Sequence, residues 1–440
     1  MARRFIPFAL FALPALTLSI GVAAASGPTL QARSYDVYGS PAPMEEAPMK
    51  GLDGYEGDVL LASRRGMAEP TITIDTENIS LADLAASRSR GAEWLKGVQK
   101  NDGGWGAGSW GTDDPAAPSD VATTSMAILA LVRDANGSDV HDDAINRAVR
   151  YVAAVVERSP ADSARLDVPE GTQPQYKLGQ TVDTHLAALM LGEVEGTFDD
   201  ATNRIVSNAH QLVIGKVQMA QNSDGSFDSN GWAPVLSSSI AATSLDRAVQ
   251  LGYDVDDEVL AKNDAYQKDK IDRDGNVDTS AGAGVDLYAA ASALKGNREA
   301  EKRAPVSSPR AEEARVARQA AAGRVTGDSS GALFTGFGSA GGEEMLSYMM
   351  ISDTLAEDGG KDWVQWEKKV GAYLVGTQNA DGSWAGAHCI TSRTFVTASA
   401  MMSLGAGDFA KVRASRDGVE SGVRKASTDG IFAPDHSTVR

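Results

Sequence analysis

Two short groups of chemically versatile residues lie in the C-terminal third of the sequence. Glu343 and Glu344 are adjacent carboxylates that open an apolar helical pattern, and His388 and Cys389 are neighbours before the next one. A glutamate can act as a general acid or base, and a histidine beside a thiol can activate it as a nucleophile. We therefore take these four as candidate catalytic residues. The alternative is a hydrogen-bonded loop whose acidic residues complement a helix dipole.

Four further side chains are candidates for binding a ligand. Asp183 and His185 open an earlier apolar helical pattern, and Tyr348 lies in the helix that begins with the two glutamates. Arg393 begins the last such pattern and has the charge to pair with either glutamate. If the loops before these helices open at one end of the fold, these side chains would converge with the candidate catalytic group.

A recurring sequence motif is expected to position these residues. Three times a helical pattern ends in Gln, followed by Asp-Gly three and four positions later and by an aromatic residue six positions later. Glycine permits a left-handed turn, and a Gln amide can bond backbone groups left open at helix ends. We interpret the following repeat residues as structural: Gln99, Asp102, Gly103, Trp105, Gln221, Asp224, Gly225, Phe227, Gln378, Asp381, Gly382 and Trp384.

Helical periodicity extends from about residue 80 to residue 405, without a credible alternating strand pattern. Amphipathic helices alternate with helices rich in Ala, Ser and Thr, which predicts outer and inner layers. A charged segment at about 298–340 is predicted to interrupt the array as an insertion. The pattern predicts five to six helical hairpins, at 87–100 with 120–133, 141–157 with 178–194, 200–221 with 236–251, 256–270 with 282–294, 310–322 with 342–357, and 361–378 with 394–405.

The repeat resembles the QW motif of the prenyltransferase/squalene cyclase superfamily. The copies that end in Trp105 and Trp384 match best, and the resemblance covers about residues 85–405. It implies an all-α fold, an α/α toroid in which inner helices surround a central cavity. The layout is more similar to secreted members of unknown activity than to the known enzymes.

The chemistries of that superfamily are not matched where they should be. Its class II terpene cyclases use an Asp-x-Asp-Asp acid, and 254–257 has these letters (Asp-Val-Asp-Asp). This tetrad falls at a predicted turn that opens an outer helix, where acidic residues serve as caps. Its zinc-dependent prenyltransferases need Asp two residues before a cysteine, and Ala387 stands there instead. We expect no metal and no cofactor.

The first 80 residues predict export and a spacer. Arg3 and Arg4 precede an apolar run over 5–22 and a small-residue cleavage site at 23–25, which is typical of a signal peptide. After cleavage the protein is expected to be periplasmic or extracellular, without stable membrane insertion. We divide the chain into a signal peptide (1–25), a disordered spacer (26–80), the toroid (81–406) and a polar tail (407–440).

Composition narrows the possible partners. The net charge of −18 disfavours nucleic acid and anionic membranes, and a single cysteine excludes an intrachain disulfide. An intact frame without an intact catalytic signature favours a binding role, in which an apolar, isoprenoid-like ligand or a peptide occupies the toroid or its rim. The alternative is an enzyme, either a terpene cyclase-like isomerase or lyase or a carboxylate-based glycan-processing enzyme. A purely structural role is a third possibility.

Overall fold

The computed structural model describes residues 79–429, apart from 111–116, 228, 269, 271, 273–275, 277, 329–330 and 338–339. The expected signal peptide and nearly all of the expected spacer lie outside these residues. Within the described part, the chain is helical and contains no β-strand. No helix in this part is both long and apolar enough to cross a bilayer.

The helices form six hairpins, each with an outer and an inner helix. Two shorter elements, α5 (Gln173–Leu178) and the 3₁₀ turn η3 (Ser280–Gly282), lie in the connections. The hairpins are α2 (Leu81–Gly97) with α3 (Val121–Ala135), α4 (Asp142–Arg158) with α6 (Val182–Val194), α7 (Asp200–Met219) with α8 (Pro234–Leu251), α9 (Asp257–Lys268) with α10 (Asp286–Arg303), α11 (Pro309–Thr326) with α12 (Gly342–Asp358), and α13 (Gly360–Thr377) with α14 (Arg393–Asp429).

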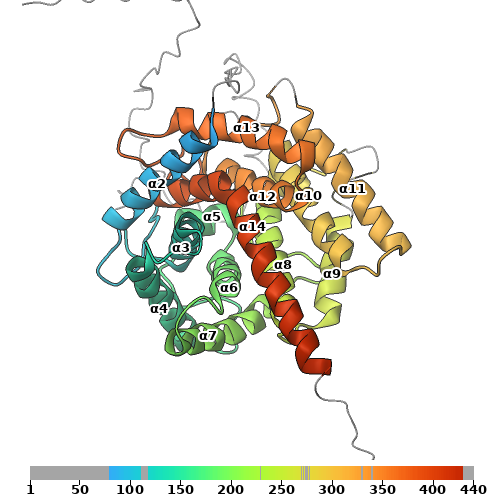
Figure 1. Ribbon diagram of the computed structural model, residues 1–440, viewed down its shortest axis with the longest axis horizontal. Coiled ribbons are helices and arrows are strands. Elements are labelled where there is room, and N and C mark those ends of the chain that lie inside the picture. The colour runs from blue at the N-terminus through green and yellow to red at the C-terminus, as the bar shows by residue number, and fades with distance from the viewer. Residues whose placement is uncertain are drawn as a thin grey trace, which may run out of the picture. The chain divides into compact units, whose positions relative to one another are not determined.

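The inner helices close into a ring. α3 packs on α6, α6 on α8, and the series continues through α10 and α12 to α14, which returns to α3. Figure 1 shows the outer helices around this ring, and α13 meets α2 where the first and last hairpins join. The fold is therefore the all-α toroid that the repeat predicts.

Composition explains which helices lie inside. Every residue of α6 is buried, and α3 is nearly as enclosed, because Ala, Ser and Thr let helices approach closely. Several inner hydroxyl groups bond back to their own helix, for example Ser399 to the Phe395 carbonyl at 3.0 Å. Outer helices bury a single stripe, which in α4 runs from Ala144 to Val156.

The glutamine of each repeat joins its own turn to the next outer helix. The Gln99 side-chain amide donates to the carbonyl oxygens of Gly103 and Ala144, both at 2.8 Å. The two later copies make the equivalent pairs of bonds, Gln221 to Gly225 (3.3 Å) and Val259 (2.8 Å), and Gln378 to Gly382 and Ser87 (both 2.8 Å). Because Ser87 lies in α2, the last copy closes the ring.

The Asp-Gly-aromatic part of each repeat forms the turn itself. Asp102 accepts a bond from the Gly104 amide at 2.9 Å, and Gly103 has φ +90°. The Trp105 ring is buried and its Nε1 donates to the Leu95 carbonyl at 2.9 Å. Equivalent aspartate bonds and positive φ angles occur at Asp224 and Gly225 and at Asp381 and Gly382, with Phe227 and Trp384 buried.

Two segments differ from the sequence-based prediction. The charged segment expected as an insertion is mostly regular, since α10 continues to Arg303 and α11 packs on α10 as an outer helix. The tail expected after Gly407 continues as helix α14 to Asp429. Polar composition predicted that the array is interrupted in the first segment and has ended in the second, but both segments are mainly helical.

Candidate functional site

Glu344 fixes the start of α12 and has little capacity left for chemistry. Its side chain is fully buried. One oxygen accepts from the Gly341 amide at 2.9 Å, and the other accepts from the Phe337 amide at 3.0 Å and from the Tyr288 hydroxyl. One carboxylate thereby joins the start of α12 to the loop that precedes it and to α10.

Glu343 has one oxygen without a partner. Its Oε2 accepts from the Ile390 amide at 3.2 Å, whereas the buried Oε1 has no hydrogen bond among the described residues. Burial, and next the charge of Glu344, raise the pKa of Glu343 to about 7, and Lys177 opposes this shift. Glu343 is thus partly protonated at neutral pH, as an acid or base must be.

His388 and Cys389 lie beside these glutamates, as the sequence predicts, but the thiol is not activated. His388 Nε2 is 3.7 Å from Glu344 Oε2, and its ring packs against Phe337. Burial, followed by the charge of Glu343, raises the pKa of the Cys389 thiol to about 12. A nucleophilic cysteine needs the opposite shift. Cys389 also has φ +59°, which a non-glycine residue seldom adopts.

Asp183 and His185 do not join this cluster. Asp183 accepts from the Ala122 amide at 2.8 Å and from Gln175 at 2.9 Å, and so ties α6 to α3 and to α5. His185 is fully buried and shares a 3.0 Å bond with Ser237. Burial lowers the pKa of His185 to about 3, so the ring is neutral.

Tyr348 and Arg393 also have structural partners. The Tyr348 hydroxyl donates to the Phe334 carbonyl at 2.7 Å, and the two rings stack 4.6 Å apart. Arg393 pairs with Asp381 of the last repeat and lies over the Trp94 ring. It therefore does not pair with Glu343 or Glu344, because the turn of the repeat holds it.

Lys177 is a residue near the glutamates that sequence reasoning missed. Its ammonium group lies 5.6 Å from the centre of the Trp110 ring and 5.0 Å from that of Trp232. Trp110 in turn donates from Nε1 to the Cys389 carbonyl at 2.6 Å. These residues come from α5 and from three separate loops, so no spacing in the sequence brings them together.

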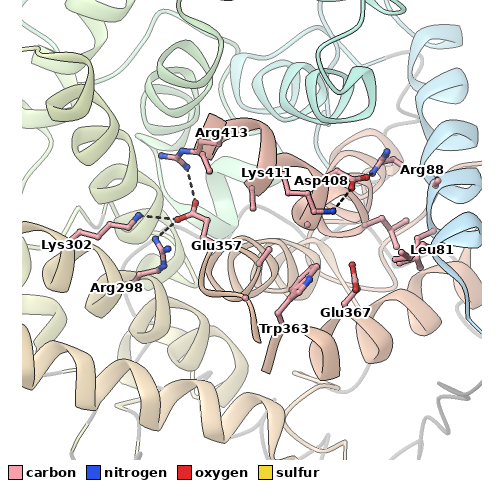
Figure 2. Close-up of a pocket in the computed structure, with 18 of the residues that line it drawn as sticks. Leu81, Arg88, Arg298, Lys302, Glu357, Trp363, Glu367, Asp408, Lys411 and Arg413 are labelled. Carbon is pink, nitrogen blue, oxygen red and sulfur yellow. Dashed lines mark hydrogen bonds and ion pairs between the residues drawn. The ribbon is translucent and has the colours of Figure 1, made fainter. Parts of the chain in front are cut away.

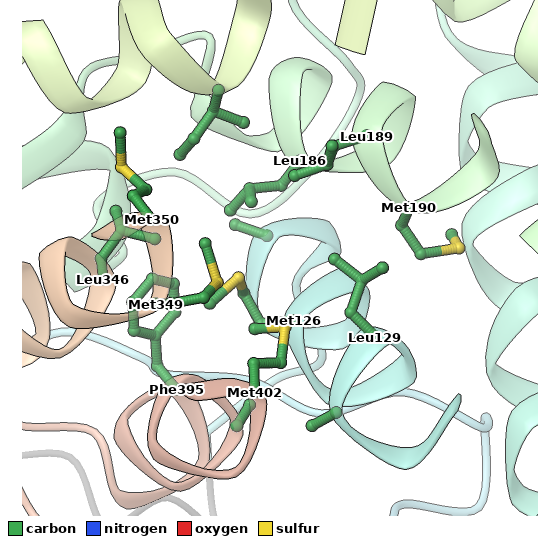
Figure 3. Packing of buried hydrophobic residues seen from close by; sticks show 14 of the residues in the cluster. Met126, Leu129, Leu186, Leu189, Met190, Leu346, Met349, Met350, Phe395 and Met402 are labelled. Atoms are coloured by element: carbon green, nitrogen blue, oxygen red, sulfur yellow. The ribbon is translucent and has the colours of Figure 1, made fainter. Parts of the chain in front are cut away.

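The lumen of the toroid is filled. Figure 3 shows methionine, leucine and phenylalanine side chains from four inner helices meeting in its centre. A cavity between the inner helices, lined in part by Leu129, Leu189 and Met349, has a volume of about 30 Å³, which is enough for about one water molecule. The labelled side chains are all buried: Met126, Leu129, Leu186, Leu189, Met190, Leu346, Met349, Met350, Phe395 and Met402.

Both ends of the ring are also bridged. At the N-terminal ends of the inner helices, Gln173 of α5 bonds the carbonyls of Ala107 and Ser109 and the amides of Thr391 and Ser392. At the opposite end, ion pairs cross the ring between inner helices, from Arg133 to Asp353 at 2.6 Å and from Arg413 to Glu193 and Glu357, both at 3.2 Å. The predicted central cavity is therefore closed as well as filled.

A larger pocket lies at the rim, at the C-terminal end of the inner helices. It has a volume of about 720 Å³ and is enclosed mainly by α2, α13 and the middle of α14, residues 404–414 (Figure 2). α10 and α12 contribute Arg298, Lys302 and Glu357 at one end. Apolar side chains also line it, namely Leu81, Leu84, Ala85, Ala356, Trp363, Leu404, Ala410 and Ala414.

The charged side chains of this rim pocket are almost all paired with one another. Glu357 forms ion pairs with Arg298, Lys302 and Arg413. Asp408 receives Arg88 at 3.3 Å and Lys411 at 3.5 Å. In the described part of the chain, no hydrogen bond or ion pair within 4 Å reaches the third carboxylate, Glu367.

The Asp-Val-Asp-Asp tetrad belongs neither to the cluster around Glu343 nor to the rim pocket. Asp256 and Asp257 are exposed at the start of the outer helix α9, and Asp256 accepts from the Glu258 amide at 2.8 Å. This arrangement is the capping role predicted from the sequence.

The fold is similar to solved structures of the type II terpene cyclase MstE from Scytonema. A variant in complex with geranylgeranyl dihydroxybenzoate is 13% identical over 75% of this chain and 98% of that chain, with a TM-score of 0.35. For the apo enzyme the identity is 14%, the coverage 76% and 99%, and the TM-score 0.32. No protein-family model and no curated protein matches the sequence. At these identities and TM-scores the likeness carries no argument about family or activity.

Proposed function

We propose that this toroid is a binding protein whose ligand, an apolar or amphipathic small molecule, occupies the rim pocket rather than the lumen. The observation that supports this is volume: about 720 Å³ at the rim against about 30 Å³ between the inner helices. Pockets for drug-sized ligands measure roughly 300–1,000 Å³. An isoprenoid-like chain has the apolar character that the apolar lining of the rim pocket would accept.

Filling the rim pocket tests this proposal. Ala410 lines the pocket, so Ala410→Trp should lower several-fold the amount of small molecule that solvent extraction and mass spectrometry recover from purified protein. Ala154→Trp is the matched control, because Ala154 is exposed on the outer helix α4. Equal recovery from both variants, or no ligand from the unaltered protein, would contradict the proposal. Recovery of a peptide instead would replace the small molecule by a peptide ligand.

An enzyme is the second candidate, and the unpartnered Oε1 of Glu343 is the observation that favours it. The carboxyl group lies beside Lys177 and holds a proton near neutral pH. Such a group suits proton transfer, in a cyclase-like isomerase or a glycan-processing enzyme. If the recovered ligand is converted by the protein and Glu343→Gln stops the conversion, the enzyme reading is favoured; an unchanged ligand argues for binding alone.

We propose that the protein acts outside the cytoplasm. The basic, apolar and small-residue order of the first 25 residues supports export. N-terminal sequencing of the mature protein tests this, because cleavage after Ala25 leaves Ser26 as the first residue. An intact N-terminus on protein recovered from the cytoplasm would contradict it.

A further inference from the structure

We infer that the rim pocket recognises a positively charged group, an organic ammonium carried by an apolar body, through Glu367 and Trp363. The inference rests on the proposed function, since it names the ligand class of the same pocket. It follows from the pairing of charges in the pocket and from the arrangement of two side chains on α13.

The cations that line the rim pocket already have carboxylate partners. Arg88, Arg298, Lys302, Lys411 and Arg413 line the pocket, and each is within 4 Å of a carboxylate. An anionic ligand would have to break these pairs. Glu367 is the only lining carboxylate in the described chain without such a cation, so the charge that a ligand can add without a loss is positive.

The electrostatic surroundings of Glu367 agree with this. Its carboxylate is half-buried, and burial together with Asp408 raises its pKa, while Lys411 opposes the shift. Lys411 is a weak partner because its side chain is 81% exposed and is directed to Asp408. A ligand cation that displaced water from this place would relieve the repulsion between the two acids.

The aromatic ring of Trp363 accompanies the carboxylate of Glu367 on α13. Trp363 and Glu367 are four residues apart, so they lie on the same face of α13. Figure 2 shows both side chains directed into the pocket, with no dashed line at Glu367. An aromatic face next to a carboxylate is a suitable receptor for an ammonium group, because the ring quadrupole and the charge attract it together.

A glycine lets α14 close over this pair. A Cβ on Gly407 would come within 3.0 Å of the Trp363 ring and 3.4 Å of Glu367 Oε1. The backbone of α14 therefore lies directly against both groups and forms the wall opposite them. The pair is held in a defined position rather than spread over an open surface, which lowers the entropy cost of binding.

Three probes of equal chain length test the inference: dodecyltrimethylammonium and dodecyl sulfate, titrated calorimetrically below their micelle concentrations, and dodecanol, titrated below its solubility limit. We expect the ammonium probe to bind about tenfold more tightly than the other two, which corresponds to about 1.4 kcal/mol. Glu367→Gln should abolish this preference and leave dodecanol binding unchanged. Trp363→Leu should reduce the preference. Glu258→Gln, at an exposed carboxylate of α9, is the control for general charge.

The outcomes separate the two proposals. If none of the probes binds, the proposed function fails and the inference fails with it. If all three bind with equal affinity, the binding function stands and the inference is overturned. Tighter binding of the sulfate also overturns it, as does an ammonium preference that persists in Glu367→Gln, since the net charge of −18 would then be the cause.

Discussion

At the scale of residues, buried carboxylates hold the N-terminal ends of the inner helices together. Asp120 accepts hydrogen bonds from the amides of Ala107 and Thr123, and Asp183 of α6 accepts one from the Ala122 amide of α3. Glu344 uses both oxygens in the same way. Each acid replaces the water that would otherwise satisfy these backbone groups. Glu343 is the exception, because one of its oxygens remains unbonded.

Glu343→Gln should therefore flatten the dependence of stability on pH. The pKa of Glu343 is about 7 in the folded protein, against 4.5 for the ordinary side chain. Between these values the native state keeps a proton that the unfolded chain has lost, so the free energy of unfolding falls as pH rises. The amide has no such proton. The variant should lose on the order of 2–3 kcal/mol less between pH 5 and 8, measured by urea unfolding.

Asp120 does not confuse this comparison. Burial, and next Asp183, raise its pKa to about 7 as well, but both proteins contain this residue and its contribution cancels. Parallel pH profiles for the variant and the unaltered protein would show that Glu343 is ionised in the fold and that its free oxygen has a partner.

Sequence reasoning predicted where Glu343, Glu344, His388 and Cys389 gather but not their surroundings. The loops before neighbouring inner helices meet at one end of a toroid, so these four residues could be placed together. Lys177 could not be, because α5 is a six-residue helix inside a long connection and has no repeat signal. The pairing of Arg393 with Asp381 was also missed, since both residues belong to the frame.

At the scale of elements, the last repeat closes the toroid. The Gln378 amide bonds carbonyl groups of its own turn and of α2, and its carbonyl oxygen accepts from Ser87 at 2.7 Å. The first and second copies join neighbours in sequence, whereas this copy joins residues 291 positions apart. This side chain therefore adds specific hydrogen bonds to the packing of α13 and α14 on α2 at the junction.

Gln378→Ala should weaken the whole fold. The change leaves the Gly382 carbonyl of the turn without its donor and the Ser87 hydroxyl without its acceptor, and removes a second donor from the Ser87 carbonyl of α2, at a cost of about 1–3 kcal/mol for each group left unbonded where water cannot reach. We expect the free energy of unfolding to fall by about 2–4 kcal/mol in denaturant titration. Gln211→Ala, on an exposed position of α7, should change it by less than about 0.5 kcal/mol. Equal effects of the two substitutions on the free energy of unfolding would contradict the role of Gln378 in closing the ring.

At the scale of the whole molecule, the lumen of the toroid is filled and the larger pocket lies on its rim. The succession of helical hairpins followed from the period of the sequence and the repeat turns, but the ends of the helices did not, since α10 and α14 extend well beyond the predicted ends at 294 and 405. The filled lumen did not, because inner helices rich in small residues predict close packing without saying which side chains meet in the centre. The rim pocket was missed because most of the wall that α14 contributes, from Gly407 to Ala414, was predicted to be a tail.

The most direct test of this account locates a bound apolar chain by fluorescence quenching. Trp363 lines the rim pocket, so the bromine of 11-bromoundecanol should quench its emission saturably. In Trp363→Phe that quenched component should disappear while binding persists. If the variant shows the same saturable quenching as the unaltered protein, the chain binds elsewhere and the central claim, a ligand pocket at the rim of a filled toroid, is contradicted.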